Sequence, residues 1–320
     1  MTFGIDIGGT KCAVCVLEQN GQITQIHRMA TRGPDETLAD LAAAVARAEP
    51  GPAPLIGISG GTLAADRGLI TGAPNLPGWD DVPVVDYFHR RFGGPAYLMN
   101  DAKACALAEW RFGAGRGCRH MAFLTAGTGM GAGLILDGRL YLGGGNAGEV
   151  GHMRLAPDGP WGHGKRGSFE GFCSGGGIGR WAQEFLRDRG LPGGFGCARR
   201  EEVTAAAVGA AAAGGDPLAA EFLALVGGRL GEALALMVDM LDLERIVIGS
   251  VYVRSQKWLE PAMRQALERE ALPGSLANCR IVPAALGEQV GNYGAIAVAE
   301  YNHNPARFTL SATSTSPGAV

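Results

Sequence analysis

The sequence predicts an α/β protein built from two similar halves with a cleft between them. A strand, a glycine-rich turn and a second strand occupy residues 3–17, and the same pattern returns at residues 121–136. Segments with the apolar spacing of helices occur at residues 37–48 and between residues 176 and 241. Two copies about 120 residues apart indicate two domains of related construction.

The strands of the first half are predicted at residues 3–7, 12–17 and 55–59. The first two flank the turn Gly8-Gly9-Thr10-Lys11, and the third ends at Gly60-Gly61. A hairpin, a helix and a strand in this order are typical of an α/β domain.

The second half contains strands predicted at residues 121–126, 132–136, 245–249 and 279–283, and a final helix at residues 291–300. The first two of these strands again flank a glycine turn. We therefore expect this half to repeat the construction of the first.

Glycines at residues 113–117 indicate the hinge. We predict a smaller N-terminal domain over residues 1–114, rejoined by the final helix at about residues 291–303. A larger C-terminal domain covers residues 115–290. The tail at residues 304–320 includes a Ser- and Thr-rich stretch that cannot bury enough apolar surface to be ordered, so we expect it to be mobile.

Composition limits the partners of this chain. Its 320 residues are 47% hydrophobic and carry a net charge of −3, so no basic surplus exists to bind nucleic acid or an acidic membrane surface. No apolar run approaches the roughly 18 residues of a membrane span, and no leader pattern opens the sequence. We expect a cytoplasmic protein, and the seven scattered cysteines predict no disulfides.

The segment Asp6-Ile7-Gly8-Gly9-Thr10-Lys11 predicts a phosphate site. Its two glycines let backbone amides approach an anion, and a hydroxyl, an ammonium and a carboxylate stand beside them for phosphate and Mg²⁺. A hairpin closed by Gly8-Gly9 alone would not need these neighbours. The second turn, Gly127-Thr128-Gly129, supports the same interpretation.

This pair of loops resembles the ROK family, named for repressors, open reading frames and kinases, within the actin-like ATPase superfamily. Four further segments agree in order: Gly57-Ile58-Ser59-Gly60-Gly61, Pro74-Asn75-Leu76-Pro77-Gly78-Trp79, Asn100-Asp101-Ala102 and Gly148-Glu149-Val150-Gly151-His152. The resemblance covers residues 3–300. It implies a two-domain actin-like ATPase (ribonuclease H-like) fold and an ATP- and Mg²⁺-dependent sugar kinase similar to glucokinases, N-acetylhexosamine kinases or fructokinases.

Asp101 is the candidate catalytic base. Asn100-Asp101 follows an apolar strand at residues 96–99 and opens a helix, so the carboxylate is expected at a strand end beside a helix N-terminus. By itself this position fits a helix N-cap equally well. The resemblance implies that Asp101 accepts the proton of the substrate hydroxyl.

The resemblance also implies the remaining site residues. The residues expected at the sugar are Gly61, Asn75, Asn100, Asp101, Glu149, His152 and Glu170. Those expected at the nucleotide are Asp6, Gly8, Gly9, Thr10, Lys11, Gly127, Thr128, Gly129 and Gly249. Without the surrounding motif, we would interpret His152 as a core histidine whose hydrogen bonds are satisfied.

The sequence departs from the family at a zinc site. Many members carry Cys-Gly-Cys-Gly-x-x-Gly-Cys-x-Glu after this histidine, three cysteines that complete a tetrahedral zinc site. Here Trp161, His163 and Ser168 stand at those positions. We expect no structural zinc and a loop held by packing, for which Trp161 and Phe169 are the candidates.

Lys103 replaces a residue that is often Asn in the family. The simpler expectation is that it faces solvent, as most lysines do, and the alternative is a contact with a charged substrate group or a phosphate.

Three other functions stay open: a kinase of a cyclitol or amino sugar, a sugar-binding protein without catalysis, and a repressor. Repressors of the family carry a DNA-binding helical domain before the first loop, whereas five residues precede Asp6 here, so we expect an enzyme that acts on a small molecule. A homodimer is a further expectation from the family.

Overall fold

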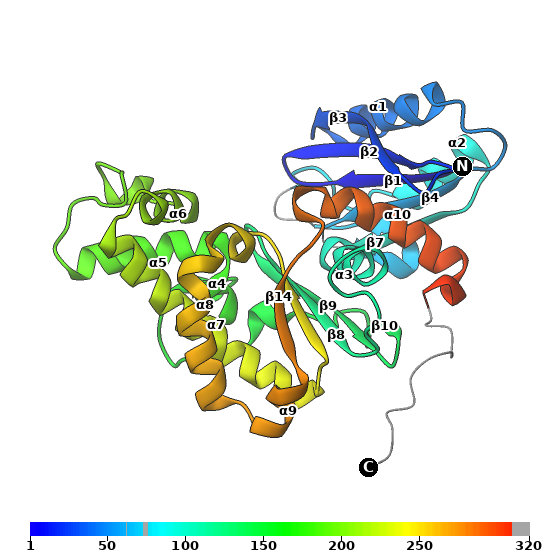
Figure 1. Ribbon diagram of the computed structural model, residues 1–320. Coiled ribbons are helices and arrows are strands. Elements are labelled where there is room, and N and C mark those ends of the chain that lie inside the picture. The colour runs from blue at the N-terminus through cyan, green and yellow to red at the C-terminus, as the bar shows by residue number, and fades with distance from the viewer. Residues whose placement is uncertain (62, 73–75, 309–320) are drawn as a thin grey trace, which may run out of the picture.

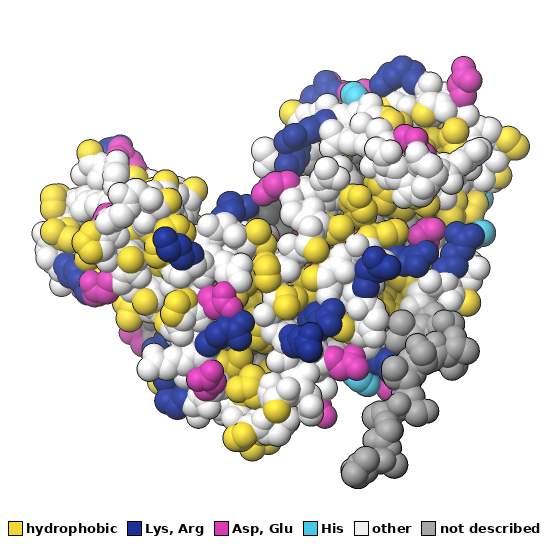
Figure 2. Space-filling view, in the orientation of Figure 1, with side chains coloured by type: hydrophobic (Ala, Val, Ile, Leu, Met, Phe, Trp, Pro, Cys, Tyr) yellow, Lys and Arg dark blue, Asp and Glu magenta, His cyan; other side chains and the backbone are white. Residues whose placement is uncertain are grey.

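The computed structural model describes residues 1–61, 63–72 and 76–308. Two lobes are each built around a five-stranded sheet, and helices α3 (Asp101–Phe112) and α10 (Val290–His303) lie between the sheets (Figure 1). The surface is deeply hollowed between the lobes (Figure 2). None of the described helices combines the length and apolar character that a bilayer crossing requires.

The first sheet has the order β3-β2-β1-β4-β7. Its strands are β1 (Thr2–Ile7), β2 (Lys11–Leu17), β3 (Ile23–Ala30), β4 (Leu55–Gly60) and β7 (Ala96–Asn100). Strands β1, β2 and β3 pair antiparallel, whereas β4 pairs parallel to both β1 and β7. The carboxyl ends of β1, β4 and β7 therefore meet at one edge of the sheet, as is usual for binding edges in α/β proteins.

Helices cover both faces of this sheet. One face carries α1 (Pro34–Arg47) and α2 (Val84–Phe92), and the other carries α10 (Figure 1). Gly57 on β4 permits the close approach of α10, because a Cβ there would lie 2.0 Å from the Ala295 carbonyl oxygen. The short elements between β4 and α2 are β5 (Leu63–Ala64), η1 (Ala65–Arg67) and β6 (Leu69–Ile70).

The second sheet repeats the first, strand for strand. Its order is β10-β9-β8-β13-β14, formed by β8 (Met121–Ala126), β9 (Met130–Leu136), β10 (Arg139–Tyr141), β13 (Arg245–Ile248) and β14 (Arg280–Pro283). Again the hairpin strands pair antiparallel and the last three pair parallel. The predicted duplication is confirmed.

Helices of the second lobe pack on this sheet and on one another. They are α4 (Phe169–Cys173), α5 (Gly175–Asp188), α6 (Ala205–Ala213), α7 (Pro217–Leu241), α8 (Val251–Glu270) and α9 (Pro273–Asn278). The helical stretch predicted from residue 176 to 241 is interrupted at residues 189–204, where Gly190 takes a positive φ of 68°, and at residues 214–216 before the Asp216 N-cap. Sequence periodicity missed α8.

The remaining described elements are 3-10 turns and a small hairpin: η2 (Val150–His152), β11 (Trp161–Gly162), β12 (Lys165–Arg166), η3 (Arg200–Glu202), η4 (Gly287–Gln289) and η5 (Pro305–Arg307). Residues 309–320, most of the tail that we expect to be mobile, lie outside the described residues.

Glu109 joins the two places where the chain crosses between the lobes. Its carboxylate is fully buried near the C-terminal end of α3. It accepts hydrogen bonds from the Ala114 amide (2.7 Å) on the outgoing crossing, and from the Ala285 (3.2 Å) and Leu286 (2.9 Å) amides on the returning one. The boundary predicted at residue 114 falls in the outgoing crossing and stays a prediction.

We predict that Glu109→Gln lowers the free energy of unfolding by about 2 kcal/mol or more, because an amide loses the charge-assisted bonds and presents an NH₂ group to backbone donors. Urea unfolding measures this. Glu300→Gln is the matched control, since Glu300 on α10 is also buried but pairs with the exposed side chain of Arg307. Equal losses in the two variants would contradict a special role for the crossings.

Candidate functional site

The first glycine loop is a tight turn between β1 and β2. The Gly8 amide donates to the Lys11 carbonyl oxygen (3.1 Å), and a Cβ on Gly8 would lie 2.9 Å from the same oxygen, so the turn requires glycine here. Gly9, Thr10 and Lys11 are exposed at the tip. The Gly8 amide therefore serves the turn itself, and an anion would meet the residues after it.

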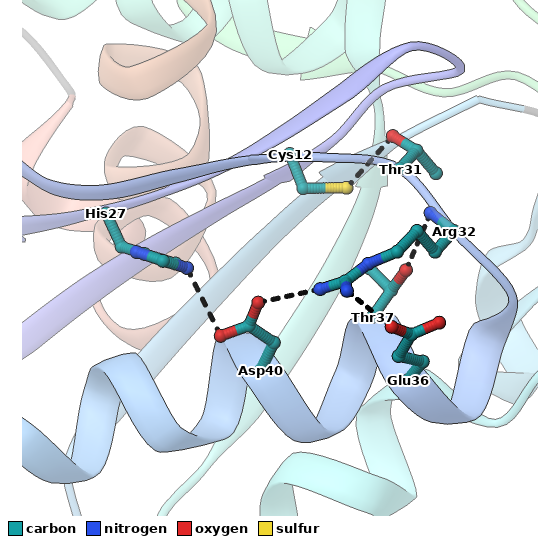
Figure 3. Close-up of polar contacts among 7 residues, drawn as sticks. All are labelled: Cys12, His27, Thr31, Arg32, Glu36, Thr37 and Asp40. Atoms are coloured by element: carbon teal, nitrogen blue, oxygen red, sulfur yellow. Dashed lines mark hydrogen bonds and ion pairs between the residues drawn. The ribbon is translucent and has the colours of Figure 1, made fainter.

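Thr31 holds this loop from behind. Its amide donates to the Thr10 carbonyl oxygen (3.1 Å), and its hydroxyl donates to that of Gly8 (2.6 Å). Figure 3 shows how the neighbouring Arg32 is in turn fixed by Glu36 and Asp40 of α1. Thr31 therefore fixes the backbone of the turn at both Gly8 and Thr10.

The second glycine loop lies between β8 and β9 and rests on the N-terminus of α5. The Gly127 carbonyl oxygen accepts from the Gly175 amide (2.7 Å), and that of Thr128 from the Gly176 amide (3.2 Å). Thr128 is exposed. The sequence reasoning missed this contact of Gly175 and Gly176 with the second loop, although their Ser-Gly-Gly-Gly run is a visible signal.

Glu170 on α4 reaches this second loop. Its Oε2 accepts from the Met130 amide (3.1 Å) and would lie 3.0 Å from a Cβ on Gly129. The residue assigned to the sugar by resemblance therefore also braces the loop assigned to phosphate. It connects the two expected binding regions.

Asp6 and Asp101 lie close together at the carboxyl edge of the first sheet. Burial, and secondly the charge of Asp101, raise the pKa of Asp6 to about 6. Ser59, opposite Asp6 on β4, lies beside the Asp6 carboxylate and opposes this rise, a contact that sequence reasoning also missed. A Cβ on Gly291 would lie 2.7 Å from Asp6 Oδ2, so the start of α10 closes this side.

Asn100, and not Asp101, is the N-cap of α3. Its Oδ1 accepts from the amides of Ala102 (3.0 Å) and Lys103 (3.4 Å). The N-cap interpretation of Asp101 is therefore wrong. Asp101 is the first helical residue, has exposed surface, and accepts from the Ala102 amide (2.7 Å).

The surroundings of Asp101 favour its protonated form. Crowding by protein atoms raises its pKa, the Ala102 amide opposes this rise, and the charge of Glu149 adds to it. Glu149 thus lies near Asp101 although the two belong to different lobes. The charge of Asp101 therefore acts on Asp6, and that of Glu149 acts on Asp101.

The model of the ROK family matches residues 2–302. The chain belongs to the ROK family.

Proteins similar to this ROK protein include both kinases and a transcriptional regulator. A glucokinase of Thermotoga maritima is 30% identical over 92% of this chain and 96% of its own. The crystal structure of a ROK family glucokinase from Streptomyces griseus with glucose and AMPPNP is 31% identical, covers 92% of this chain and 97% of its own, and has a TM-score of 0.74. A ROK family transcriptional regulator, a homologue of the E. coli MLC protein, is 25% identical with a TM-score of 0.82 and covers 96% of this chain and 78% of its own. The predicted two-domain actin-like ATPase fold is confirmed.

His152 is exposed in this ROK protein, so it is not a buried core histidine. It closes the turn η2, which begins after Glu149. Its ring meets that of His163 edge to face at 4.6 Å between centroids. Among the residues that the structure describes, no group of three or more His, Cys, Asp or Glu side chains could hold a metal ion.

Hydrogen bonds hold the segment after His152. Ser168, at a position where the resemblance implies cysteine in many members, is fully buried, accepts from the Gly171 amide (3.1 Å) and donates to the Gly162 carbonyl oxygen (3.3 Å). Phe169 is fully buried as expected, but the Trp161 side chain is exposed, so the expectation that Trp161 packs inside is wrong. The Arg180 guanidinium holds the Trp161 carbonyl oxygen instead (2.8 Å).

Gly61 and Asn75, expected at the sugar, and Gly249, expected at the nucleotide, lie in separate parts of the chain. Gly61 follows β4, and Asn75 lies outside the described residues. Gly249 follows β13 and donates its amide to the Leu124 carbonyl oxygen (2.9 Å). The next residue, Ser250, has φ 55° and ψ −117°, a strained conformation for a residue other than glycine.

Lys103 was expected to face solvent, but it is only 7% exposed, and that expectation is wrong.

We predict that Ser168→Ala lowers the free energy of unfolding by about 1 kcal/mol and speeds amide hydrogen exchange in residues 161–168, because the cap of α4 and the bond to Gly162 are both lost. Ser174→Ala is the matched control, since Ser174 is equally buried and caps α5 through the Gly177 amide (2.9 Å). Unchanged exchange at residues 161–168 in the Ser168 variant would contradict the role given to this hydroxyl.

Proposed function

We propose that this protein transfers the γ-phosphoryl group of ATP to a hydroxyl group of a hexose or a related sugar. The observation that supports this function most directly is the capping of α3. Asn100 caps the first turn of α3, so the Asp101 carboxylate stands at the N-terminus of this helix beside Asp6, which precedes the first glycine loop. Gly131, which follows the second loop, lies against Ala102, since a Cβ on Gly131 would be 3.5 Å from the Ala102 Cβ. A base next to two anion-binding turns is the arrangement that phosphoryl transfer to an alcohol requires.

In this proposal the two glycine loops take the phosphates. Gly9, Thr10 and Lys11 of the first loop and Thr128 of the second offer exposed backbone and side-chain donors, while Gly8, Gly127 and Gly129 allow the chain to pass close to the anion. Gly249 is assigned to the nucleotide by resemblance. Closure of the lobes would exclude water that could otherwise hydrolyse ATP.

Asp6 fits the Mg²⁺ ion that would accompany ATP. Burial and the charge of Asp101 make the Asp6 carboxylate costly to ionise, and a divalent cation relieves such a cost. When bound, the ion would neutralise charge on the phosphates. We propose that no structural zinc is needed, because Ser168 and Arg180 hold the segment after His152.

Asp101 accepts the proton of the attacking hydroxyl. Its raised pKa makes it a stronger base than an ordinary aspartate, and the Ala102 amide orients it. Glu149, His152 and Glu170, with Gly61, Asn75 and Asn100, are assigned to the sugar hydroxyls. Positioning of the acceptor and stabilisation of charge supply most of the rate.

A hexose is the first acceptor to test, because two relatives at 30% and 31% identity are glucokinases. A cyclitol or an amino sugar is the alternative, since the segment around His163 and Ser168 departs from the family pattern. The regulator among the relatives has the same fold, so fold does not separate kinase from repressor, and the intact base favours the kinase. We further propose a cytoplasmic location and, from the resemblance alone, a homodimer.

The function is tested by ADP release from Mg·ATP with a panel of hexoses, N-acetylhexosamines, fructose and cyclitols. We expect one acceptor to raise the rate strongly above that with ATP alone. If no acceptor does so while ATP still binds, the kinase function is wrong.

We predict that Asp101→Asn lowers kcat by a factor of about 100 or more while the affinities for sugar and ATP persist, because a general base contributes about 10²–10⁴ in rate. Steady-state kinetics and calorimetric binding measure this. Asp86→Asn, in the first turn of α2, is the control and should leave kcat unchanged. Near-normal kcat in the Asp101 variant would refute the assignment.

We predict that kcat falls at acid pH with a midpoint above 3.8, the ordinary pKa of aspartate, because Asp101 must be deprotonated and its pKa is raised. Glu149→Gln removes a negative charge that raises this pKa, so the midpoint should move to lower pH. The measurement is kcat at saturating sugar and ATP across the acid range. A midpoint that stays in place or rises in this variant would contradict the coupling.

A further inference from the structure

Lys103 is a cation in an unfavourable place. It occupies the first turn of α3, where the helix dipole disfavours positive charge, and its side chain is only 7% exposed. Burial lowers the pKa of Lys103, and the charge of Glu149 opposes this shift. A buried ammonium is retained only when neighbouring groups compensate it.

One compensating partner lies on the other lobe. The Lys103 ammonium donates to the carbonyl oxygen of Gly145. Gly145 lies in the middle of the segment at residues 142–148, which joins β10 to Glu149 and contains glycine at positions 143, 144, 145 and 148. The contact therefore links the helix that begins with Asp101 to the segment that ends at Glu149.

Backbone bonds fold this segment into a local turn, and among the described bonds the one from Lys103 ties this turn to α3. Gly143, Gly145 and Gly148 take positive φ angles of 55°, 111° and 95°, and glycines lose more conformational entropy on ordering than other residues. Local backbone bonds run from the Gly145 and Ala147 amides to the Leu142 carbonyl oxygen (2.8 and 3.3 Å), and the Ala132 amide of β9 donates to the Gly148 carbonyl oxygen (2.7 Å). Among the described contacts, Lys103 supplies the side-chain bond to this stretch.

We propose that Lys103 is a positioning residue for sugar binding, which holds the segment at residues 142–148 on α3 so that Glu149 faces Asp101. Lysine suits this role because a compact ammonium on a long stem carries three donors and reaches across from the helix. Lys103 acts through Glu149, so its removal should weaken sugar binding more than it slows phosphoryl transfer. The kinetic part of this inference rests on the proposed function.

The kinetic test is Lys103→Met, which keeps the length of the side chain and removes its charge and donors. With glucose, or with whichever acceptor the panel identifies, we expect KM for the sugar to rise about tenfold or more, as for loss of a charged hydrogen bond. KM for ATP and kcat should change by less than about threefold. Lys257→Met, an exposed lysine on α8, is the control. An unchanged KM for the sugar, or an equal loss in kcat, would overturn the proposal.

A double-mutant cycle with Glu149→Gln separates positioning from direct contact. If Lys103 acts through Glu149, the double variant should have the sugar KM of Glu149→Gln alone, within about twofold. If the two effects multiply, Lys103 contacts the substrate independently and the positioning role is wrong.

A third measurement does not depend on catalysis. Hydrogen exchange of the unliganded protein should show faster exchange at residues 142–148 in Lys103→Met than in Lys257→Met or in the unaltered protein. Unchanged exchange would overturn the tether even if the protein phosphorylates sugars. Faster exchange in a protein without kinase activity would support the tether and refute the proposed function alone.

Discussion

The packing of α3 between the two sheets is the constraint on which the site depends. Its apolar side chains, with Leu107 and Trp110 among them, share one buried cluster with Phe123 and Ile135 of the second sheet and Val298 of α10. The contact is close, because a Cβ on Gly133 of β9 would lie 2.4 Å from the Ala106 Cβ. A helix held this tightly carries both of its ends to defined places. Its N-terminus brings Asp101 to the hollow between the lobes, and its C-terminal half brings Glu109 to both crossings of the chain.

The site concentrates negative charge and accepts a cost for doing so. Crowding by protein atoms raises the pKa of Asp6 and of Asp101, the charge of Asp101 adds to the first shift, and the charge of Glu149 adds to the second. In a folded protein without ligands such a group is destabilising, which is the usual trade between stability and function. Binding of a cation and of a sugar with several hydroxyls would relieve the strain. Lys103 provides part of that relief within the chain itself.

Hydrogen bonds order the segment in which the resemblance implies zinc-binding cysteines for many members. A serine hydroxyl, an arginine and backbone bonds such as that from the Phe169 amide to the Met153 carbonyl oxygen (2.8 Å) hold residues 153–170. Hydroxyl and backbone groups make weaker bonds than a metal–thiolate site, so several are needed where one ion would serve. Glu170, the second residue of α4, follows the Ser168 cap and reaches the second glycine loop.

The sequence by itself determined the duplicated strand, turn and strand pattern, the family, and the strand-end position of Asn100-Asp101. These signals are local, since turn glycines and apolar periodicity act over a few residues. Tertiary structure decided the rest: that Asn100 caps the helix, that Lys103 points inward to Gly145, and that α3 lies between the sheets. Glu109 illustrates the reason, because its partners at Ala285 and Leu286 lie 176 and 177 residues away along the chain. No local pattern encodes such a contact, which exists only once both sheets have formed and packed.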